Sequence, residues 1–305
     1  MAGQPIRIGT RDSELATWQA KKVAAELQNS GHQTELIFVK SEGDLDLTTP
    51  LTEMGGKGVF TKALDDALLE DRIDLAVHSY KDLPTENPLP LIVSAVMERE
   101  DPRDSLVAPK GTDFLDDPTV QATVATSSNR RRAQWLHRYP NHKITNIRGN
   151  VNTRLRKVSE NGWHGAIFAA AGLKRINLDH NISAYLNWMI PAPAQGAMAV
   201  MVREDDDKLI NITSELNHSE TALCTGIERE LLNEMEAGCS APVGAYAWIE
   251  EKQLIFQAVA LKIDGSLQYD IEMTAPVHEA KGLGRKAAQK LLDQGADKLV
   301  EDLRK

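Results

Sequence analysis

The chain has few cysteines, with only Cys224 and Cys239 among 305 residues. Two cysteines cannot build the disulfide framework of a small secreted domain, so we expect a reducing, cytoplasmic setting. The sequence also lacks the long apolar run of a transmembrane helix, and we expect no association with a membrane. Residues 1–5 lead directly into an apolar alternation without the apolar stretch of a signal peptide, so we expect no export signal.

Aromatic residues and positive charge are also scarce. Aromatic side chains make up 5% of the chain, and the net charge is −9. A nucleic-acid-binding protein needs a basic surface and rings that stack on bases, so these values argue against that class. The 8 histidines are dispersed without cysteine or carboxylate partners at ligand spacing, and we expect no metal site. The P-loop, the dinucleotide fingerprint and the nucleophile elbow are absent.

What is present is the composition of a soluble globular protein, long enough for two or three domains, with 42% apolar and 26% charged residues. Positive charge is concentrated between Pro118 and Ser159, where arginines and lysines occur without any Asp or Glu. A basic segment in an acidic protein indicates a site for a polyanion. The alternative is a solvated basic face.

Apolar periodicity predicts strands that alternate with helices. The predicted strands are 6–10, 34–39, 73–79, 91–96, 120–125, 143–147, 166–171 and 196–202. The predicted helices are 13–27, 60–69, 152–159 and 220–236, with a further helix that begins at Ser127-Ser128. This alternation is typical of a parallel or mixed α/β sheet. Residues 245–274 predict three further strands, and a closing helix from about Glu279 would complete a small α+β domain. The polar, glycine-containing residues 40–58 predict a mobile lid.

Residues 73–85 carry a polar cluster where a strand ends. Ile73, Leu75 and Val77 alternate as one face of a strand, and Ser79, Tyr80, Lys81 and Asp82 follow before Leu83-Pro84. Ligands of α/β proteins usually bind at this end of the sheet, so Asp82 would be a carboxylate on a constrained turn. The alternative is an ordinary surface aspartate.

Basic residues recur at the predicted strand-to-helix junctions. They are Arg11 with Ser13, Arg130 to Arg132 after Ser127-Ser128, Arg148 and Arg154 around Asn150, and Lys174-Arg175 after Ala171-Gly172. The free backbone N–H groups of a helix start and the guanidinium fork both favour carboxylate or phosphate.

Cys239 lies in a Gly- and Pro-containing segment just past a predicted helix. No histidine partner is recognisable, so this thiol is better suited to attachment of a group than to nucleophilic catalysis. Cys224 falls within helical periodicity and is expected to be a core thiol.

Eight segments, taken together, resemble the porphobilinogen deaminase family. In chain order they lie at 9–19, 55–60, 76–84, 127–131, 148–155, 171–175, 195–197 and 238–244. Ser41 stands where the family more often has threonine, Ala237 stands where glycine is more usual, and Arg132 lies outside the motif. None of these departures removes a functional group.

The resemblance implies an α/β fold with two modules like type II periplasmic binding proteins, a small C-terminal α+β domain, and an active site in the cleft between the two modules. The expected domains are 1–98 with 197–216, 104–194, and 220–305. It also implies a monomeric, cytoplasmic transferase of tetrapyrrole (haem or chlorophyll) biosynthesis. Such an enzyme adds four porphobilinogen units to a dipyrromethane cofactor held by a thioether to Cys239. Hydrolysis then releases hydroxymethylbilane, with possible hand-over to uroporphyrinogen-III synthase.

The resemblance assigns roles to individual residues of this chain. Asp82 would be catalytic, because a carboxylate stabilises the positive charge that develops on the pyrrole when ammonia leaves. The expected cofactor-binding residues are Lys81, Asp82, Thr126, Ser128, Arg130, Arg131 and Arg154, besides Cys239. The expected substrate-binding residues are Arg11, Ser13, Ser79, Arg148, Arg175, Gln195 and Lys57. The rival hypotheses are a two-lobed binding protein for a small dianion and a nucleic-acid protein that uses residues 130–157.

Overall fold

The computed structural model describes residues 4–40, 61–85, 88, 90–236 and 241–301. Residues 41–58 of the predicted lid, Lys57 among them, and Cys239 lie outside this range. By their contacts the residues divide into two units. Unit 1 comprises residues 1–100 and 197–222, and unit 2 comprises residues 101–196 and 223–305.

Unit 1 is built on a five-stranded sheet of order β2-β1-β3-β10-β4. The strands are β1 (Ile6–Thr10), β2 (Thr34–Phe38), β3 (Leu75–Ser79), β4 (Leu91–Val96) and β10 (Met198–Arg203). β1 is parallel to β2 and β3, whereas β10 runs antiparallel between β3 and β4. The predicted return of the chain to the first sheet through β10 is therefore confirmed.

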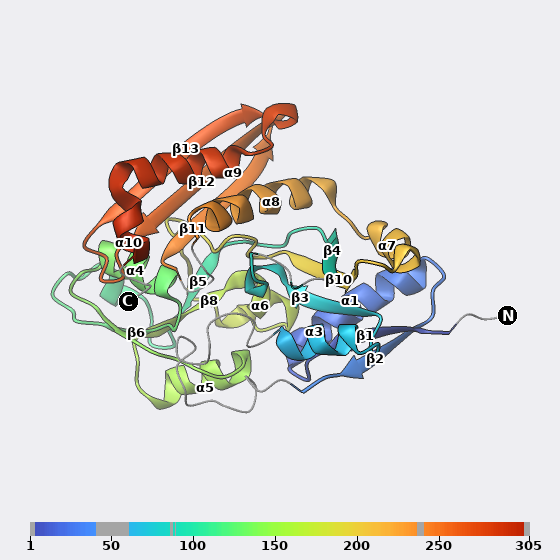
Figure 1. Ribbon diagram of the computed structural model, residues 1–305. Coiled ribbons are helices and arrows are strands. Elements are labelled where there is room, and N and C mark those ends of the chain that lie inside the picture. Colours follow the sequence, from blue (N-terminus) through green and yellow to red (C-terminus); the bar gives the residue numbers. More distant parts are fainter. Residues whose placement is uncertain (1–3, 41–60, 86–87, 89, 237–240, 302–305) are drawn as a thin grey trace. The chain divides into compact units, whose positions relative to one another are not determined.

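Helices cover both faces of this sheet (Figure 1). α1 (Glu14–Asn29) and α7 (Asp207–Ser214) share one apolar cluster with Leu75 and Val77, and α3 (Lys62–Leu69) shares another with Ala76 and Ile73. Successive strand residues point to opposite faces, so β3 is buried on both. Ile73 precedes β3 and packs in the α3 cluster, so the prediction that it shares one face with Leu75 and Val77 is wrong.

Gly9 allows Ile73 and α3 to approach this sheet closely. A Cβ on Gly9 would collide with the Cδ1 of Ile73 and lie 3.1 Å from Cδ2 of Leu64. Because Gly9 has no side chain, Ile73 packs against its backbone and is fully buried.

Unit 2 contains a second five-stranded sheet of order β7-β6-β8-β5-β9. The strands are β5 (Asp104–Val107), β6 (Thr123–Ala125), β7 (Lys143–Thr145), β8 (Gly165–Ala169) and β9 (Ala184–Tyr185). In the spatial order of each sheet, three parallel strands are followed by an antiparallel strand, which is β10 in unit 1 and β5 in unit 2. In both cases the chain reaches this strand directly from the other unit. This shared order confirms the predicted pair of α/β modules.

The helices of this sheet begin at polar caps. α4 (Asn129–Arg138) is capped by Ser128, and α5 (Val151–Glu160) is capped by Asn150, whose side chain accepts from the Thr153 N–H at 2.9 Å. Such caps satisfy backbone donors that have no partner inside the helix. α6 (Ala170–Arg175) follows β8 directly. Lys174 and Arg175 lie in its last turn, so their predicted place at a helix start is wrong.

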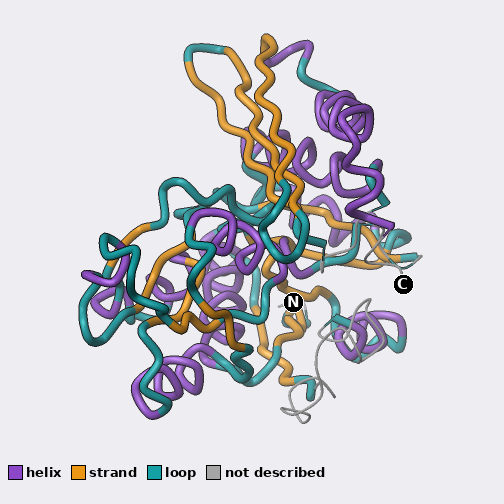
Figure 2. The backbone as a smooth tube through the Cα atoms, turned by 90° about the vertical axis from the view of Figure 1, so that its left-hand side faces the viewer, coloured by secondary structure: helices purple, strands orange, loops and turns teal. Residues whose placement is uncertain are grey.

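The C-terminal part of unit 2 is an antiparallel sheet, β11-β12-β13, with helices on one face (Figure 2). Its elements are α8 (Ser219–Glu234, which begins in unit 1), β11 (Val243–Glu250), β12 (Gln253–Leu261), β13 (Gln268–Pro276), α9 (Leu283–Leu291) and α10 (Asp297–Glu301). The predicted three strands are confirmed, and the closing α-helix begins at Leu283 after a short 3-10 turn. Cys224 is buried in this core, as predicted.

Candidate active site

In unit 1, two neighbouring strands end at the same edge of the sheet. β1 and β3 are parallel, with Gly9 opposite Ala76, so the residues that follow each strand leave the sheet on the same side. Those residues are Arg11 and Ser13 after β1, and Lys81 and Asp82 after Ser79 at the end of β3. Ser13 also caps α1, accepting from the Ala16 N–H at 3.3 Å.

The turn that carries Asp82 is anchored on both sides. β3 passes into a 3-10 turn over Tyr80–Asp82. Before the turn, Gln19 Nε2 donates to Ser79 Oγ at 2.8 Å, and the Tyr80 N–H donates to the Ala197 carbonyl at 3.0 Å. After the turn, Leu83 is buried at 1% exposure. The Asp82 carboxylate is thus exposed on a backbone with little freedom to move.

His78 places a neutral ring beneath this edge. It is 6% exposed, and its Nε2 atom has no hydrogen-bond partner among the described residues. Burial, and secondarily the positive charge of Arg11, lower the pKa of His78 to about 4. The imidazole therefore adds no positive charge beside Arg11 at neutral pH.

In unit 2, Asp104 binds two arginines at once. Its Oδ2 accepts from Arg130 Nη1 at 2.7 Å, and its Oδ1 accepts from Arg131 Nε at 2.9 Å. Each arginine also donates to a backbone carbonyl, that of Ile190 at 2.7 Å or Ile167 at 3.0 Å. Asp104 is fully buried, and the two arginines are 4% and 7% exposed.

This cluster holds one negative and two positive charges in a buried place. Burial by itself would raise the pKa of Asp104, but the charges of Arg130 and Arg131 hold it well below its usual range. The carboxylate is therefore ionised, and the three side chains carry a net charge of +1. Arg130 Nε is buried without a partner among the described residues. An excess buried positive charge and an unused N–H donor both favour an anionic ligand.

The start of α4 lies beside these arginines in the chain. Thr126 is 2% exposed, and its Oγ1 accepts from the Ser128 N–H at 3.2 Å. Ser127 joins this junction to the next one, since its Oγ donates to the Ile147 carbonyl at 2.8 Å and accepts from the Ile147 N–H at 2.9 Å. The junctions after β6 and β7 are thereby held together.

Arg148 and Arg154 belong to the second of these junctions. Arg154 Nε donates to the Gly149 carbonyl at 2.7 Å, and Lys157 Nζ donates to the Arg148 carbonyl at 3.1 Å. Gly149 has φ of +111°, a conformation that favours glycine. The left-handed turn thus brings both arginines to the start of α5.

Arg175 and Gln195 are buried near Gly196, where the chain leaves unit 2 and returns to unit 1. Arg175 Nη2 donates to the Gly196 carbonyl at 2.7 Å. Gln195 Nε2 donates to Asp104 Oδ1 at 3.0 Å and to the Pro102 carbonyl at 2.7 Å. Gln195 therefore belongs to the Asp104 cluster.

Two buried carboxylates were not among the residues predicted from the sequence. Asp104 ends a charged, proline-containing segment, residues 98–104, that carries no motif of a buried site. Glu228, on α8, accepts from the Ala194 N–H at 2.6 Å and the Ala247 N–H at 2.8 Å. Neither residue lies in a recognisable motif. The excess of arginine at the start of α4 signalled the need for a counter-charge such as Asp104, whereas no sequence signal pointed to Glu228, which accepts from backbone N–H groups.

Within the described ranges, no group of three or more His, Cys, Asp or Glu side chains is placed to hold a metal ion. The same residues contain no helix that is both long enough and apolar enough to span a membrane.

Two family models match this chain in sequence. "Porphobilinogen deaminase, dipyromethane cofactor binding domain" matches residues 6–211, and "Porphobilinogen deaminase, C-terminal domain" matches residues 222–293. The chain belongs to the porphobilinogen deaminase family. This confirms the family predicted from the motifs, with its transferase activity and its dipyrromethane cofactor.

Curated relatives from bacteria agree with the porphobilinogen deaminase models. The porphobilinogen deaminase of Syntrophotalea carbinolica is 40% identical and covers 99% of this chain and 97% of its own. That of Syntrophomonas wolfei is also 40% identical and covers 98% of this chain and 99% of its own. Among solved structures, the periplasmic VFT2 domain of Bordetella pertussis BvgS is 13% identical, with a TM-score of 0.40 over 71% of this chain and 90% of that one.

Proposed function

We propose that this chain joins four porphobilinogen units head to tail on a dipyrromethane held by Cys239, and releases linear hydroxymethylbilane and ammonia. The observation that carries the proposal is the buried cluster of Arg130, Arg131 and Asp104, with its net charge of +1. Porphobilinogen and its oligomers bear an acetate and a propionate on every pyrrole ring, and these carboxylates need such a partner.

The cofactor's carboxylates fit this cluster. Arg130 Nε is a buried donor without a partner among the described residues, and it lies next to the hydroxyl-rich start of α4. We assign cofactor binding to Lys81, Asp82, Thr126, Ser128, Arg130, Arg131 and Arg154. When bound, the dipyrromethane supplies the nucleophilic pyrrole carbon to which the units are joined.

Asp82 is the proposed catalytic residue. When ammonia leaves porphobilinogen, a positive charge develops and is shared with the pyrrole N–H. A carboxylate held on a constrained turn stabilises that charge without having to reorganise, and it can accept and return a proton. The anchoring of the turn by Gln19 and by the Ala197 carbonyl supports this role.

The remaining predicted residues are assigned to the incoming substrate and the growing chain. They are Arg11, Ser13, Ser79, Arg148, Arg175, Gln195 and Lys57. Four of the seven carry positive charge, which suits a product that gains carboxylates with every added unit.

We further propose a cytoplasmic monomer that passes its product to uroporphyrinogen-III synthase. The three domains proposed are 1–98 with 197–216, 104–194, and 220–305, the last carrying Cys239. The two cysteines and the separate C-terminal sheet support these assignments.

The intact mass of the freshly purified protein tests the proposed function. We expect a mass excess equal to two linked pyrrole units, located by peptide mapping on the Cys239 peptide. Cys239→Ala should abolish the excess, whereas Cys224→Ala should retain it, because Cys224 is a buried core thiol.

An unmodified chain would first be incubated with porphobilinogen. If the adduct then appears on Cys239, the purified protein was the apo form. If no adduct forms on the folded chain, the proposal is wrong. The result would then favour the rival hypothesis of a two-lobed binding protein for a small dianion.

A further inference from the structure

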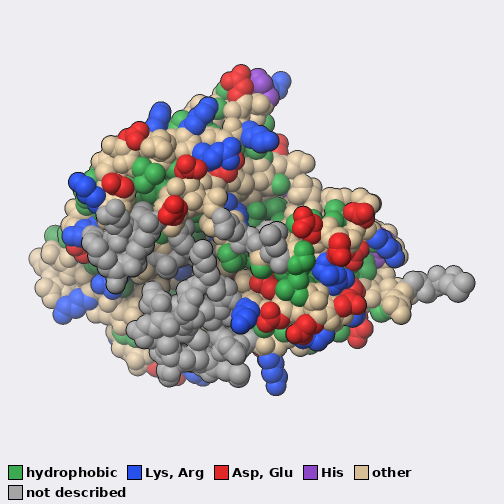
Figure 3. All heavy atoms as spheres, in the orientation of Figure 1, with side chains coloured by type: hydrophobic (Ala, Val, Ile, Leu, Met, Phe, Trp, Pro, Cys, Tyr) green, Lys and Arg blue, Asp and Glu red, His purple; other side chains and the backbone are tan. Residues whose placement is uncertain are grey.

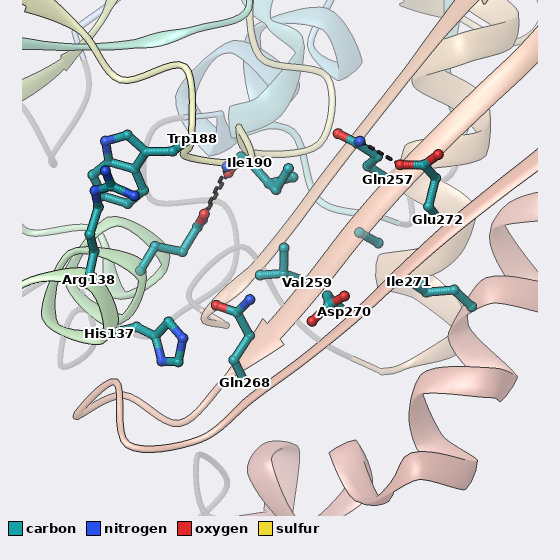
Figure 4. A pocket seen from close by; sticks show the side chains of 12 residues that line it. His137, Arg138, Trp188, Ile190, Gln257, Val259, Gln268, Asp270, Ile271 and Glu272 are labelled. Atoms are coloured by element: carbon teal, nitrogen blue, oxygen red, sulfur yellow. Dashed lines mark hydrogen bonds between the residues drawn. The ribbon is translucent and has the colours of Figure 1, made fainter.

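Unit 2 contains a cavity that includes none of the residues assigned above. It has a volume of about 550 Å³ and lies between α4 with the segment at Trp188–Ile190 and the open face of β12 and β13 (Figure 4). Cavities of this size accept small molecules.

One wall of this cavity is held together by hydrogen bonds, and it is joined to the other wall at one turn. Gln134, on α4, donates to the Ile190 carbonyl at 2.9 Å and accepts from the Ile190 N–H at 2.8 Å. Where β12 turns toward β13, His137 Nδ1 lies 2.9 Å from the Gly265 carbonyl. Gly265 has φ of +74°, and a Cβ there would lie 2.7 Å from the Leu136 carbonyl carbon. The spacing of the walls is therefore set by close backbone packing.

One wall presents a positive charge in a fixed position. The Arg138 guanidinium lies over the Trp188 ring, 5.0 Å from its centroid (Figure 4). Arg138 Nε also donates to Tyr139 Oη at 3.3 Å. Stacking on an aromatic ring restrains a guanidinium but leaves the edge with its N–H donors available. Among the described residues no carboxylate forms an ion pair with Arg138.

The opposite wall presents negative charge. Asp270 and Glu272 are two residues apart on β13 and so point to the same face of the sheet. Glu272 accepts from Gln257 Nε2 at 2.8 Å, which holds its carboxylate in place. Within the described part of the chain neither acid is paired with a cation.

We propose that this cavity binds a small, rigid zwitterion. Its carboxylate would meet Arg138, its ammonium group would meet Asp270 and Glu272, and its planar body would lie over Ile190 and Val259, which Figure 4 shows between the charged walls. A simple anion would leave the two carboxylates facing it without compensation. A simple cation would leave the positive charge of Arg138 without compensation. Only a ligand with both charges matches both walls.

The test uses 4-(aminomethyl)benzoate, a rigid aromatic zwitterion, as the probe for the holoenzyme. The chain has 5 tryptophans, so the indole N–H resonance of Trp188 can be assigned and followed during titration. We expect a saturable shift of this resonance. Benzoate and benzylamine should each bind about tenfold more weakly, because each leaves one charged wall unmatched.

Variants distinguish this site from general charge effects. Arg138→Gln and Asp270→Asn should each weaken binding about tenfold. The matched controls Arg156→Gln and Asp116→Asn change the same charges on exposed positions outside the cavity and should bind as the parent does. All four positions are exposed, so folding should be retained, and tetrapyrrole synthesis by each variant checks it.

Absence of a saturable Trp188 shift would overturn the proposal. So would equal affinity for the three probes, or an affinity that Arg138→Gln and Asp270→Asn leave unchanged.

Discussion

At the scale of single residues, the position of Asp82 is more informative than its type. The side chain is exposed, but the backbone before and after it is anchored through Ser79 and Leu83. This anchoring supports the proposed catalytic role of Asp82. The sequence could predict this position because an apolar strand, a short polar run and Leu83-Pro84 follow one another directly.

We expect Asp82→Asn to lower kcat about 100-fold, because the amide keeps the size of the carboxylate but cannot neutralise a developing positive charge. The measurement is turnover of porphobilinogen by holoenzyme whose cofactor content has been confirmed by intact mass. Asp205→Asn, an equivalent change on an exposed loop of the same unit, is the control. Near-normal turnover by Asp82→Asn would show that the carboxylate is not catalytic.

His78 should make stability depend on pH. Its pKa of about 4 in the folded protein lies below the ordinary value of 6.5, so the unfolded chain binds a proton first as the pH falls. The contribution of His78 is fully present above pH 6.5 and is lost as the pH falls toward 4, at up to about 1.4 kcal/mol per pH unit. Asp65 acts in the opposite direction, because burial raises its pKa to about 6.

Urea unfolding of the parent and of His78→Gln separates the two effects. Between pH 7 and pH 5, the parent should lose roughly 2 kcal/mol of stability relative to the variant, since only the parent has the buried imidazole. An unchanged difference between the two proteins would mean that His78 is not held neutral by burial.

At the scale of helices and strands, most of the architecture could be predicted from apolar periodicity and capping residues. β1, β2, β4 and β10 appear where the alternation of apolar residues placed them, and Ser128 caps α4 as its sequence context indicated. The errors occurred where tertiary contacts override local pattern. Ile73 packs on the face of the sheet that α3 covers, opposite Leu75 and Val77, because Gly9 leaves room for it. No local sequence pattern indicates that contact.

The Asp104 cluster shows what periodicity cannot predict. Asp104 is the first residue of β5. Its carboxylate binds Arg130 and Arg131 on α4, and it also binds Gln195, which precedes β10 in the chain. The sequence showed an excess of arginine at the start of α4, but the partner lies 26 residues away from Arg130, at the end of the charged segment 98–104. Which buried charges pair is decided by the sheet order, and a single sequence does not specify it.

Asp104→Asn should destabilise the folded chain by about 3–5 kcal/mol, because it leaves two buried arginines without a counter-charge. Urea unfolding followed by circular dichroism measures this loss. Asp116→Asn, an exposed position in the same unit, should change stability far less. A small effect of Asp104→Asn would mean that the arginines find other partners, and that the cluster is less restrained than its hydrogen bonds suggest.

At the scale of the whole molecule, the net charge is opposite in sign to the charge of the arginines proposed to bind the substrate. The chain carries a net charge of −9, and acidic side chains gather over the helices of unit 1 in Figure 3. The proposed substrate and product are also acidic. Under the proposed function, binding would depend on a few arginines within a protein whose overall charge repels the substrate. This requirement would grow as carboxylates accumulate with each added unit.

Arg148 is the residue where this requirement can be tested. We expect Arg148→Ala to stall elongation, because each new unit adds two carboxylates that the weakened site must hold. Intact mass of the enzyme during turnover should show shorter enzyme-bound intermediates than the parent accumulates. Arg156→Ala is the matched control, since Arg156 lies on α5, the helix that follows Arg148 in the chain, is 67% exposed and pairs with Glu160 at 3.4 Å. If Arg148→Ala and Arg156→Ala both show the parent's distribution of intermediates, Arg148 has no part in handling the growing chain.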